Sequence, residues 1–307
     1  MYIFITNPNA RSGQGARVWS EVEKLLKGRD ISYQVYFTKC QRHATRIVRE
    51  ITADGKEHTI VALGGDGTVN EVLNGIKELS KVTFGYIPIG SSNDFARYFG
   101  HPYDLERALN VILNPKKYAM MNVGRLTYWK GERARRFSVS TGFGFDAGIC
   151  HYAVVSRLKA VLNKFRLGKL TYVGIALAQM LALKPGRMTV CLDDGEPVSY
   201  ERVYFATAMN HPFEGGGFQF CPKADPCDDW MDVTVIAGLP KLKVLFLLPT
   251  AYKGWHTVFR GVYTFRCRKA VFASESSLPV HTDGEPIFIQ RSVAAELEQE
   301  KIRLIIG

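Results

Sequence analysis

The 307-residue sequence predicts an α/β protein in which a doubly wound, Rossmann-like domain over residues 1–121 precedes a mostly antiparallel β-sandwich domain over residues 122–307. Three observations support this prediction. The chain is longer than a usual single domain, so about two domains are expected. Apolar runs alternate with helix-patterned segments in the first third, as in a parallel sheet covered by helices. After Asn122, short β-rich segments separated by Gly, Pro and Asp turns replace this alternation.

The first elements follow one another as strand, turn and helix. Ile3–Thr6 is expected to form a buried strand, and the Asn-, Ser- and Gly-rich residues 7–15 a turn. Apolar residues then recur at helical spacing, namely Trp19, Val22, Leu25 and Leu26. A second strand is expected at Ile31–Thr38 and a helix at His43–Ile51.

The next turn, Gly64–Glu71, follows the apolar run Thr59–Leu63 and leads into another helical pattern. Its three glycines let the backbone approach a ligand closely, and the helix N-terminus carries partial positive charge, so a phosphate is the expected ligand. Asp66 would repel a phosphate unless a cation lay between them, so we interpret Asp66 as helping to hold Mg²⁺, directly or through water. The structural alternative is a tight turn in which Asp66 and Thr68 cap the helix.

A third turn of this kind, Ile89–Arg97, follows a strand expected at Thr83–Pro88. Loops that follow parallel strands meet at the carboxyl edge of the sheet, where such folds bind ligands. Asp66, Asp94 and Arg97 are therefore expected to converge at one edge.

The second domain is expected to consist of short strands with one helical insertion around Val154–Leu183. The strands are expected at Arg136–Ser140, Met188–Leu192, Tyr200–Met209, Asp232–Ala237, Val262–Phe265 and Ala270–Ala273. Residues 114–117 are the favoured boundary region, with the changeover extending to Asn122.

The net charge of +11 is concentrated in the C-terminal half. Residues 150–187 and 233–274 each contain seven Lys or Arg and no acid, and both stretches also carry large apolar residues. Bases combined with apolar surface favour peripheral contact with an anionic membrane over nucleic acid. A solvated basic face is the structural alternative.

Several classes of protein are disfavoured. No stretch approaches the roughly 18 to 20 uncharged apolar residues needed to span a bilayer. The N-terminus lacks the basic start and the length of a signal peptide, so a soluble, cytoplasmic protein is expected. The six cysteines show no CxxC pair and the histidines no ligand spacing, so we expect free thiols and no Cys/His metal site.

Six motifs occur in order along the chain: Asn7-Pro8, Gly64-Gly65-Asp66-Gly67-Thr68 with Asn70-Glu71, Pro88 to Arg97, Gly142-Phe143-Gly144-Phe145-Asp146-Ala147, Gly215-Gly216-Gly217 and Asp283-Gly284-Glu285. Together they resemble the bacterial diacylglycerol kinase-like lipid kinases over essentially the whole chain. The resemblance implies a nucleotide-binding α/β domain and a β-sandwich, with ATP and Mg²⁺ bound in the cleft. A lipid hydroxyl, such as that of diacylglycerol, would be phosphorylated there by a protein at the inner membrane face. Sphingosine and ceramide kinases share this catalytic module, and NAD kinases share the glycine-rich turn.

The resemblance also implies roles for individual residues. Asp283 would be the general base with Glu285 beside it, and Asp66 and Asp94 would join the Mg²⁺ and water network near Arg97. A base suits the chemistry, because a lipid hydroxyl must lose its proton as it attacks the γ-phosphate. The ATP contacts carried over are Asn7, Pro8, Asn9, Arg11, Ser12, Gly13, Thr38, Gly64, Gly65, Asp66, Gly67, Thr68, Asn70, Glu71, Ser91, Ser92 and Asn93.

The tetrapeptide that contains Asp283 has a second copy, Asp194-Gly195-Glu196-Pro197. Asp-Gly between two strands is a common hairpin signal, so we interpret the first copy as a hairpin turn. Because the family has its base near the C-terminus, we assign that role to Asp283, with a purely structural turn as the alternative.

An acidic loop at residues 225–230 corresponds to the place where family members with a structural Mg²⁺ bind it. The implied ligands are Asp225, Asp228 and the carbonyl of Trp230, and oxygen ligands suit this ion. Asp229 stands where the family usually has Gly, so a solvated acidic turn is equally compatible with the sequence.

Two other functions remain as alternatives to a lipid kinase. A non-catalytic nucleotide- or lipid-binding regulator is disfavoured by the intact Asp66, Asp94 and Asp283. An NAD kinase-like phosphotransferase is disfavoured because no second motif of that family is found. The acceptor lipid and the oligomeric state, including a homodimer, are left open.

Overall fold

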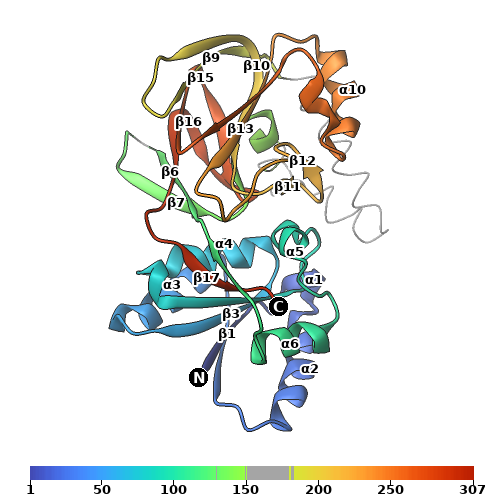
Figure 1. The fold of residues 1–307 in the computed structure, drawn as a ribbon, viewed down its shortest axis with the longest axis vertical. Coiled ribbons are helices and arrows are strands. Elements are labelled where there is room, and N and C mark those ends of the chain that lie inside the picture. Colours follow the sequence, from blue (N-terminus) through green and yellow to red (C-terminus); the bar gives the residue numbers. More distant parts are fainter. Residues whose placement is uncertain (129, 149, 151–179, 181–182) are drawn as a thin grey trace.

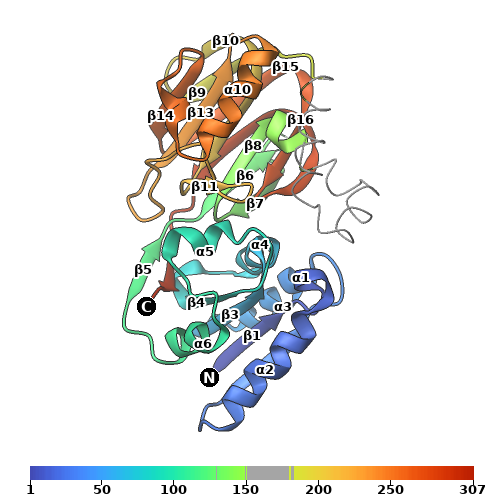
Figure 2. The same ribbon diagram turned by 90° about the vertical axis from the view of Figure 1, so that its right-hand side faces the viewer.

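The computed structural model describes residues 1–128, 130–148, 150, 180 and 183–307. Two bodies lie one above the other along the long axis of the molecule (Figures 1 and 2). The first is an α/β sheet of six strands, and the second is built on a nine-stranded antiparallel sheet. The predicted fold class is therefore confirmed.

The elements of the first body are β1 (Tyr2–Thr6), α1 (Ala10–Gly13), α2 (Gly15–Lys27), β2 (Tyr33–Phe37), α3 (His43–Ile51), η1 (Thr52–Asp54), β3 (His58–Gly64), α4 (Asp66–Gly75), η2 (Leu79–Lys81), β4 (Val82–Pro88), α5 (Asp94–Phe99), α6 (Leu105–Leu113), β5 (Tyr118–Met121) and β17 (Ile302–Ile305). The strand order is β2-β1-β3-β4-β17-β5, and all neighbours are parallel except β17 and β5.

Helices cover both faces of this sheet, which explains its apolar strands. Ile3 and Ile5 of β1 pack in one core with side chains of α3 and α4. Phe4, between them, points to the opposite face and packs with Trp19 and Val22 of α2. The alternation follows from the two-residue period of a strand.

The elements described in the second body are β6 (Gly124–Tyr128), β7 (Arg133–Phe137), β8 (Ser140–Gly144), β9 (Gly186–Leu192), β10 (Val198–Met209), β11 (Phe213–Glu214), β12 (Phe218–Gln219), β13 (Met231–Ala237), α10 (Lys241–Ala251), η3 (Trp255–Val258), β14 (Val262–Cys267), β15 (Lys269–Thr282) and β16 (Glu285–Leu297). The long strands β10 and β15 both pair with β8 and with β9. Register shifts within β10 and β15 let these strands bend around one core.

The structure corrects two sequence expectations. The strand expected at Arg136–Ser140 is the end of β7 and the start of β8, because the chain turns at residues 138–139. The last strand, β17, lies between β4 and β5 of the first sheet, although residues 122–307 were expected to form the second domain as one continuous segment. Nearly all of the helical insertion expected at Val154–Leu183 lies outside the described residues. Among the described helices, none has the length and apolar character needed to cross a bilayer.

Candidate active site

Three loops meet at the carboxyl edge of the first sheet, as the sequence predicts. The second and third loops touch through glycine backbones, since a Cβ added to Gly90 would lie 2.5 Å from Cα of Gly65. Asn7 Nδ2 in the first loop donates to Thr68 Oγ1 in the second, at 3.4 Å. The loops after β1, β3 and β4 therefore form one continuous surface.

Two carboxylates face each other within this surface. Asp66 begins α4, and its oxygens accept the backbone N–H groups of Asp94 and Phe95 at the start of α5, both at 3.2 Å. Burial, and then the negative charge of Asp94, raise the pKa of Asp66 to about 7. Burial also raises the pKa of Asp94, whose Oδ1 is buried with no hydrogen-bond partner among the described residues. A divalent cation with oxygen ligands would relieve this repulsion, so the pair fits Mg²⁺.

A glycine loop of the second body closes over Asp94. Gly216 N–H donates to Asp94 Oδ2 at 2.8 Å, and Arg97 Nε lies 3.6 Å from Asp94 Oδ1. A Cβ on Gly217 would lie 3.2 Å from the Arg97 guanidinium carbon. Since Gly217 has a φ of +113°, a side chain there would be strained as well as crowded.

Asp283 lies at the junction of the two bodies, in the turn between β15 and β16. Its carboxylate accepts backbone N–H groups from Ser138, Val139 and Ser140, the hydroxyl of Ser138, and Asn70 Nδ2 at 2.8 Å. These donors occupy both oxygens of the carboxylate. To take a proton from a substrate, Asp283 must give up one of them.

Glu285 is less occupied and lies beside the phosphate turn. Its Oε1 would be 2.6 Å from a Cβ on Gly67, while Oε2 accepts from Gln41 Nε2 at 3.3 Å.

The first copy of the tetrapeptide has different surroundings from the copy that contains Asp283. Asp194 lies in the turn between the antiparallel strands β9 and β10, where it is exposed and ion-paired with Lys269. The hairpin interpretation of the first copy is therefore confirmed.

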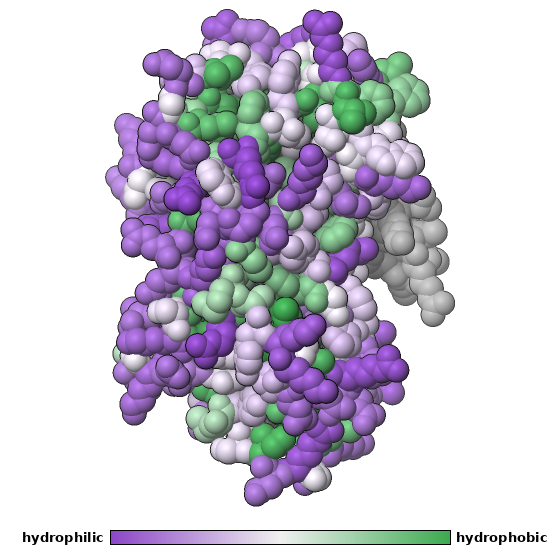
Figure 3. Space-filling view, in the orientation of Figure 1, coloured by the Kyte–Doolittle hydropathy of each residue, from purple (hydrophilic) through white to green (hydrophobic). Residues whose placement is uncertain are grey.

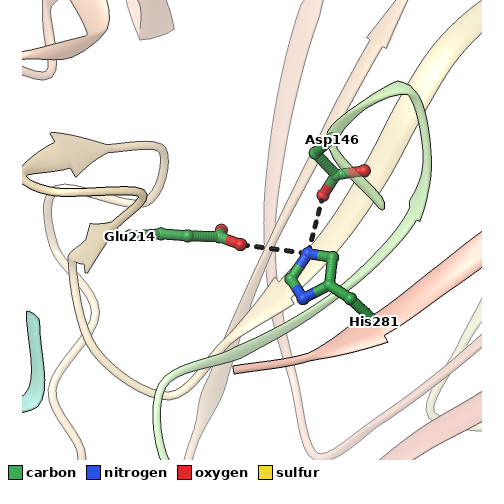
Figure 4. A group of neighbouring side chains, drawn as sticks. All are labelled: Asp146, Glu214 and His281. Atoms are coloured by element: carbon green, nitrogen blue, oxygen red, sulfur yellow. Dashed lines mark hydrogen bonds and ion pairs between the residues drawn. The ribbon is translucent and has the colours of Figure 1, made fainter. Parts of the chain in front are cut away.

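A buried cluster in the second body joins Asp146, Glu214 and His281 (Figure 4). His281 Nε2 lies 3.0 Å from Glu214 Oε1 and 3.3 Å from Asp146 Oδ2. His281 Nδ1 accepts the Gly284 N–H at 3.1 Å, so in the neutral ring the proton is on Nε2. That proton lies between the two carboxylates, which makes the cluster a hydrogen-bonded network rather than a ready metal site, although the spacing alone would suit an ion. Gly142 is required here, because a Cβ would lie 1.8 Å from Asp146 Oδ2.

The residues expected to contact ATP differ in how far they are exposed. Asn9, Arg11, Gly13, Ser91 and Ser92 are exposed at the rim, and Asn7, Pro8, Gly65, Asp66 and Gly67 are half-buried. Gly64, Thr38 and Thr68 are buried beneath these residues, and Ser12 belongs to α1.

Three further side chains in this set have protein partners instead. Asn70 contacts Asp283 and accepts from Arg135, Asn93 accepts the hydroxyl of Tyr86, and Glu71 accepts the N–H groups of Arg42 and Ala44 at the start of α3. Their direct contact with ATP stays a prediction, to which the geometry adds a structural role.

Each acid of the loop at residues 225–230 has a protein partner. Asp225 accepts from Cys227 N–H, Asp228 pairs with Arg266, and Asp229 pairs with Lys301 at 2.8 Å. The side chain of Trp230 lies under the guanidinium groups of Arg266 and Arg268. The Mg²⁺ predicted at Asp225, Asp228 and Trp230 stays a prediction, because an ion would have to displace the Arg266 pair.

Asp146 and Gly216 lie within two of the sequence motifs, but these motifs predict no role for either residue, and the spacing of the histidines indicates none for His281. Glu214, immediately before the glycine triplet, was missed. Spacing could not reveal the cluster, because its members come from three separate segments. The one local signal for His281 is its place on β15, directly before the turn that holds Asp283.

Comparisons with known proteins agree with this arrangement. The family model described as the diacylglycerol kinase catalytic domain matches residues 1–124, and the one described as the YegS C-terminal NAD kinase beta sandwich-like domain matches residues 142–305. A Bacillus subtilis (strain 168) protein named "Putative lipid kinase YtlR" is 31% identical over 288 residues, covering 92% of this chain and 93% of the relative. A Mycobacterium tuberculosis protein named "Diacylglycerol kinase" is 27% identical over 283 residues, covering 92% and 87%.

A solved structure has the same fold. The crystal structure described as "a putative diacylglycerol kinase from Bacillus anthracis str. Sterne" superimposes with a TM-score of 0.76 at 22% identity, covering 100% of this chain and 95% of that one. At a sequence identity of 22%, this structural similarity shows only that the two proteins share a fold.

Proposed function

This chain belongs to the diacylglycerol kinase-like lipid kinases, and on that premise we propose that it transfers the γ-phosphoryl group of ATP to the hydroxyl of a lipid such as diacylglycerol. The main support for this proposal is the pair of carboxylates Asp66 and Asp94, which lies where the loops after β1, β3 and β4 converge. Mg²⁺ held by this pair would neutralise charge on the transferring phosphate.

The chain's own residues supply the remaining parts. The N–H groups of the glycine turn and the N-terminus of α4 would bind phosphate oxygens, and Arg97 would bring a positive charge beside them. In the transfer, the lipid oxygen bonds to the γ-phosphorus, the bond to the β-phosphate oxygen breaks and ADP leaves. The hydroxyl proton passes to a carboxylate, for which we propose Asp283 with Glu285 beside it.

The test is a labelled-ATP assay with Mg²⁺ against diacylglycerol, monoacylglycerol, a sphingoid base, a polyprenol and NAD. NAD belongs in the panel because the second-domain family is described as NAD kinase-like. We expect transfer to a lipid and none to NAD. Transfer to NAD, or nucleotide binding without turnover on every acceptor, would overturn the proposal.

A second test uses the variant Asp66→Asn. Its side-chain oxygen can still accept an N–H group from the N-terminus of α5, but the negative charge of the carboxylate is removed. Loss of such a charge in phosphoryl transfer is expected to lower kcat about 100-fold or more. Glu106→Gln, an exposed acid on α6 of the same body, is the matched control and should retain wild-type turnover.

A further inference from the structure

The second body carries an exposed apolar ridge on α10 and η3. The ridge consists of Leu242, Phe246, Trp255, Val258 and Phe259, with exposed fractions of 65, 72, 60, 82 and 40%. The core contacts of α10 come from Val244, Leu247 and Ala251 on its other side. Apolar side chains gather over α10 in the space-filling view (Figure 3, upper right). Side chains this large on the outer face contribute little to packing, so they suit an interaction surface.

Local contacts connect residues within each part of the ridge. Leu242 and Phe246 are four residues apart and share one face of α10. Lys253, just after the helix, holds its ammonium 4.8 Å from the centre of the Trp255 ring. This cation–π contact joins the end of α10 to η3.

Positive charge surrounds the ridge. Residues 233–274 contain no acid. Arg266 and Lys269 are ion-paired with Asp228 and Asp194, away from the ridge sequence, whereas Lys243, Lys253 and Arg260 are exposed within it. A surface of this kind is complementary to anionic headgroups above an apolar interior.

We propose that this ridge docks the protein on an anionic lipid bilayer. The apolar side chains insert at the level of the acyl boundary, while Lys243, Lys253 and Arg260 contact lipid phosphates. A second copy of the chain is a poorer occupant, because a symmetric contact would bring the same cations of both copies together. The inference rests on the proposed function in that the acceptor lipid would be taken from the same bilayer.

Packing connects the ridge to the candidate active site. Tyr252, directly after α10, packs on Phe218 of β12 with ring centres 3.9 Å apart and ring planes tilted by 31°. β12 pairs with β11, and the glycine loop between them donates to Asp94. The end of α10 is therefore packed against the β11–β12 unit whose glycine loop closes over Asp94.

The experiment measures flotation of the full chain, without ATP, with vesicles of phosphatidylcholine alone and of equimolar phosphatidylcholine and phosphatidylglycerol. We expect binding to the anionic vesicles only, and weaker binding at high salt. Phe246→Ser with Val258→Ser should weaken it about tenfold or more. Val198→Ser, an exposed valine on the β9–β10 hairpin, is the matched control and should bind as wild type.

A charge variant, Lys243→Gln with Lys253→Gln and Arg260→Gln, should lose about fivefold per cation. This variant keeps the proposal testable if the apolar variant does not fold. Thermal unfolding shows whether each variant is folded. Wild-type binding by either folded variant would overturn the proposal. A loss of self-association in sedimentation velocity, without loss of vesicle binding, would overturn it in favour of a contact between copies. Because flotation needs no turnover, an inactive wild type that still binds would refute only the proposed function.

Discussion

At the scale of single residues, the carboxylate of Asp283 combines a proposed role in proton transfer with a structural role. As the proposed base it would have to accept a proton, yet in the structure it holds the turn between β7 and β8 through three backbone N–H groups. Because these donors occupy both oxygens, a substrate hydroxyl would have to displace one of them to reach the carboxylate.

Removal of this carboxylate therefore tests structure as well as chemistry. Asp283→Ala leaves several buried donors without partners, each costing about 1–3 kcal/mol, so we expect a loss of about 3 kcal/mol or more in the free energy of unfolding. Asp194→Ala changes the same residue in the repeated tetrapeptide, where the side chain is 73% exposed, and should stay within about 0.5 kcal/mol of wild type. Urea unfolding compares them, and equal losses would show that Asp283 does not anchor the junction.

At the scale of elements, α5 joins the acidic pair to a buried aromatic group. The helix begins at Asp94 and is followed by His101, which stacks on Phe95 and contacts Tyr86. Burial lowers the pKa of His101 to about 4, and its Nε2 has no hydrogen-bond partner among the described residues. Protonation of His101 would place an unpaired charge beneath the site.

This burial predicts acid sensitivity. Below the ordinary histidine pKa of 6.5 the unfolded chain takes up a proton that the folded chain refuses, so stability falls as the pH drops from about 6.5 to about 4. Between pH 7 and 5 the loss from His101 is about 2 kcal/mol. His101→Phe keeps the ring contacts and removes the proton, so its unfolding free energy should decline less over that range. Parallel declines in urea titrations of both proteins would contradict this cause.

Elements with a local pattern could be predicted from the sequence. α3 occupies the predicted residues, and β3 extends the predicted strand by one residue at each end, because their apolar periodicity matches the layers that they bury. The break between β7 and β8 could not be predicted. It depends on a carboxylate about 145 residues later that binds the turning N–H groups.

At the scale of the whole molecule, distant segments complete both bodies. The three loops of the candidate site follow consecutive strand-to-helix units, so their meeting could be predicted from topology. The contact between Asn70 and Asp283 spans 213 residues, and the cluster of Asp146, Glu214 and His281 spans 135. No periodicity in the sequence records such pairings, which only the folded β-sandwich specifies.

The return of β17 makes the first body depend on the end of the chain. Leu304 of β17 is fully buried in the core with α3 and α4, and β17 pairs with β4 and β5. Leu304→Ala should lower the free energy of unfolding by about 2–5 kcal/mol, because it leaves a cavity in the core that the sheet shares with α3 and α4. Arg303→Ala, the exposed neighbour on the same strand, is the control and should change it by less than about 0.5 kcal/mol.

The Leu304→Ala variant also tests which of the two bodies is destabilised by the loss of this side chain. If β17 is integral to the first sheet, partial proteolysis should cut the variant within residues 1–121 while the β-sandwich persists, and the ATP binding proposed above should weaken with it. Cleavage confined to the β-sandwich would contradict this, since it would mean that the last strand supports the body that precedes it in the chain. In that case β17 would belong energetically to the second body, and the candidate site would not depend on the last residues of the chain.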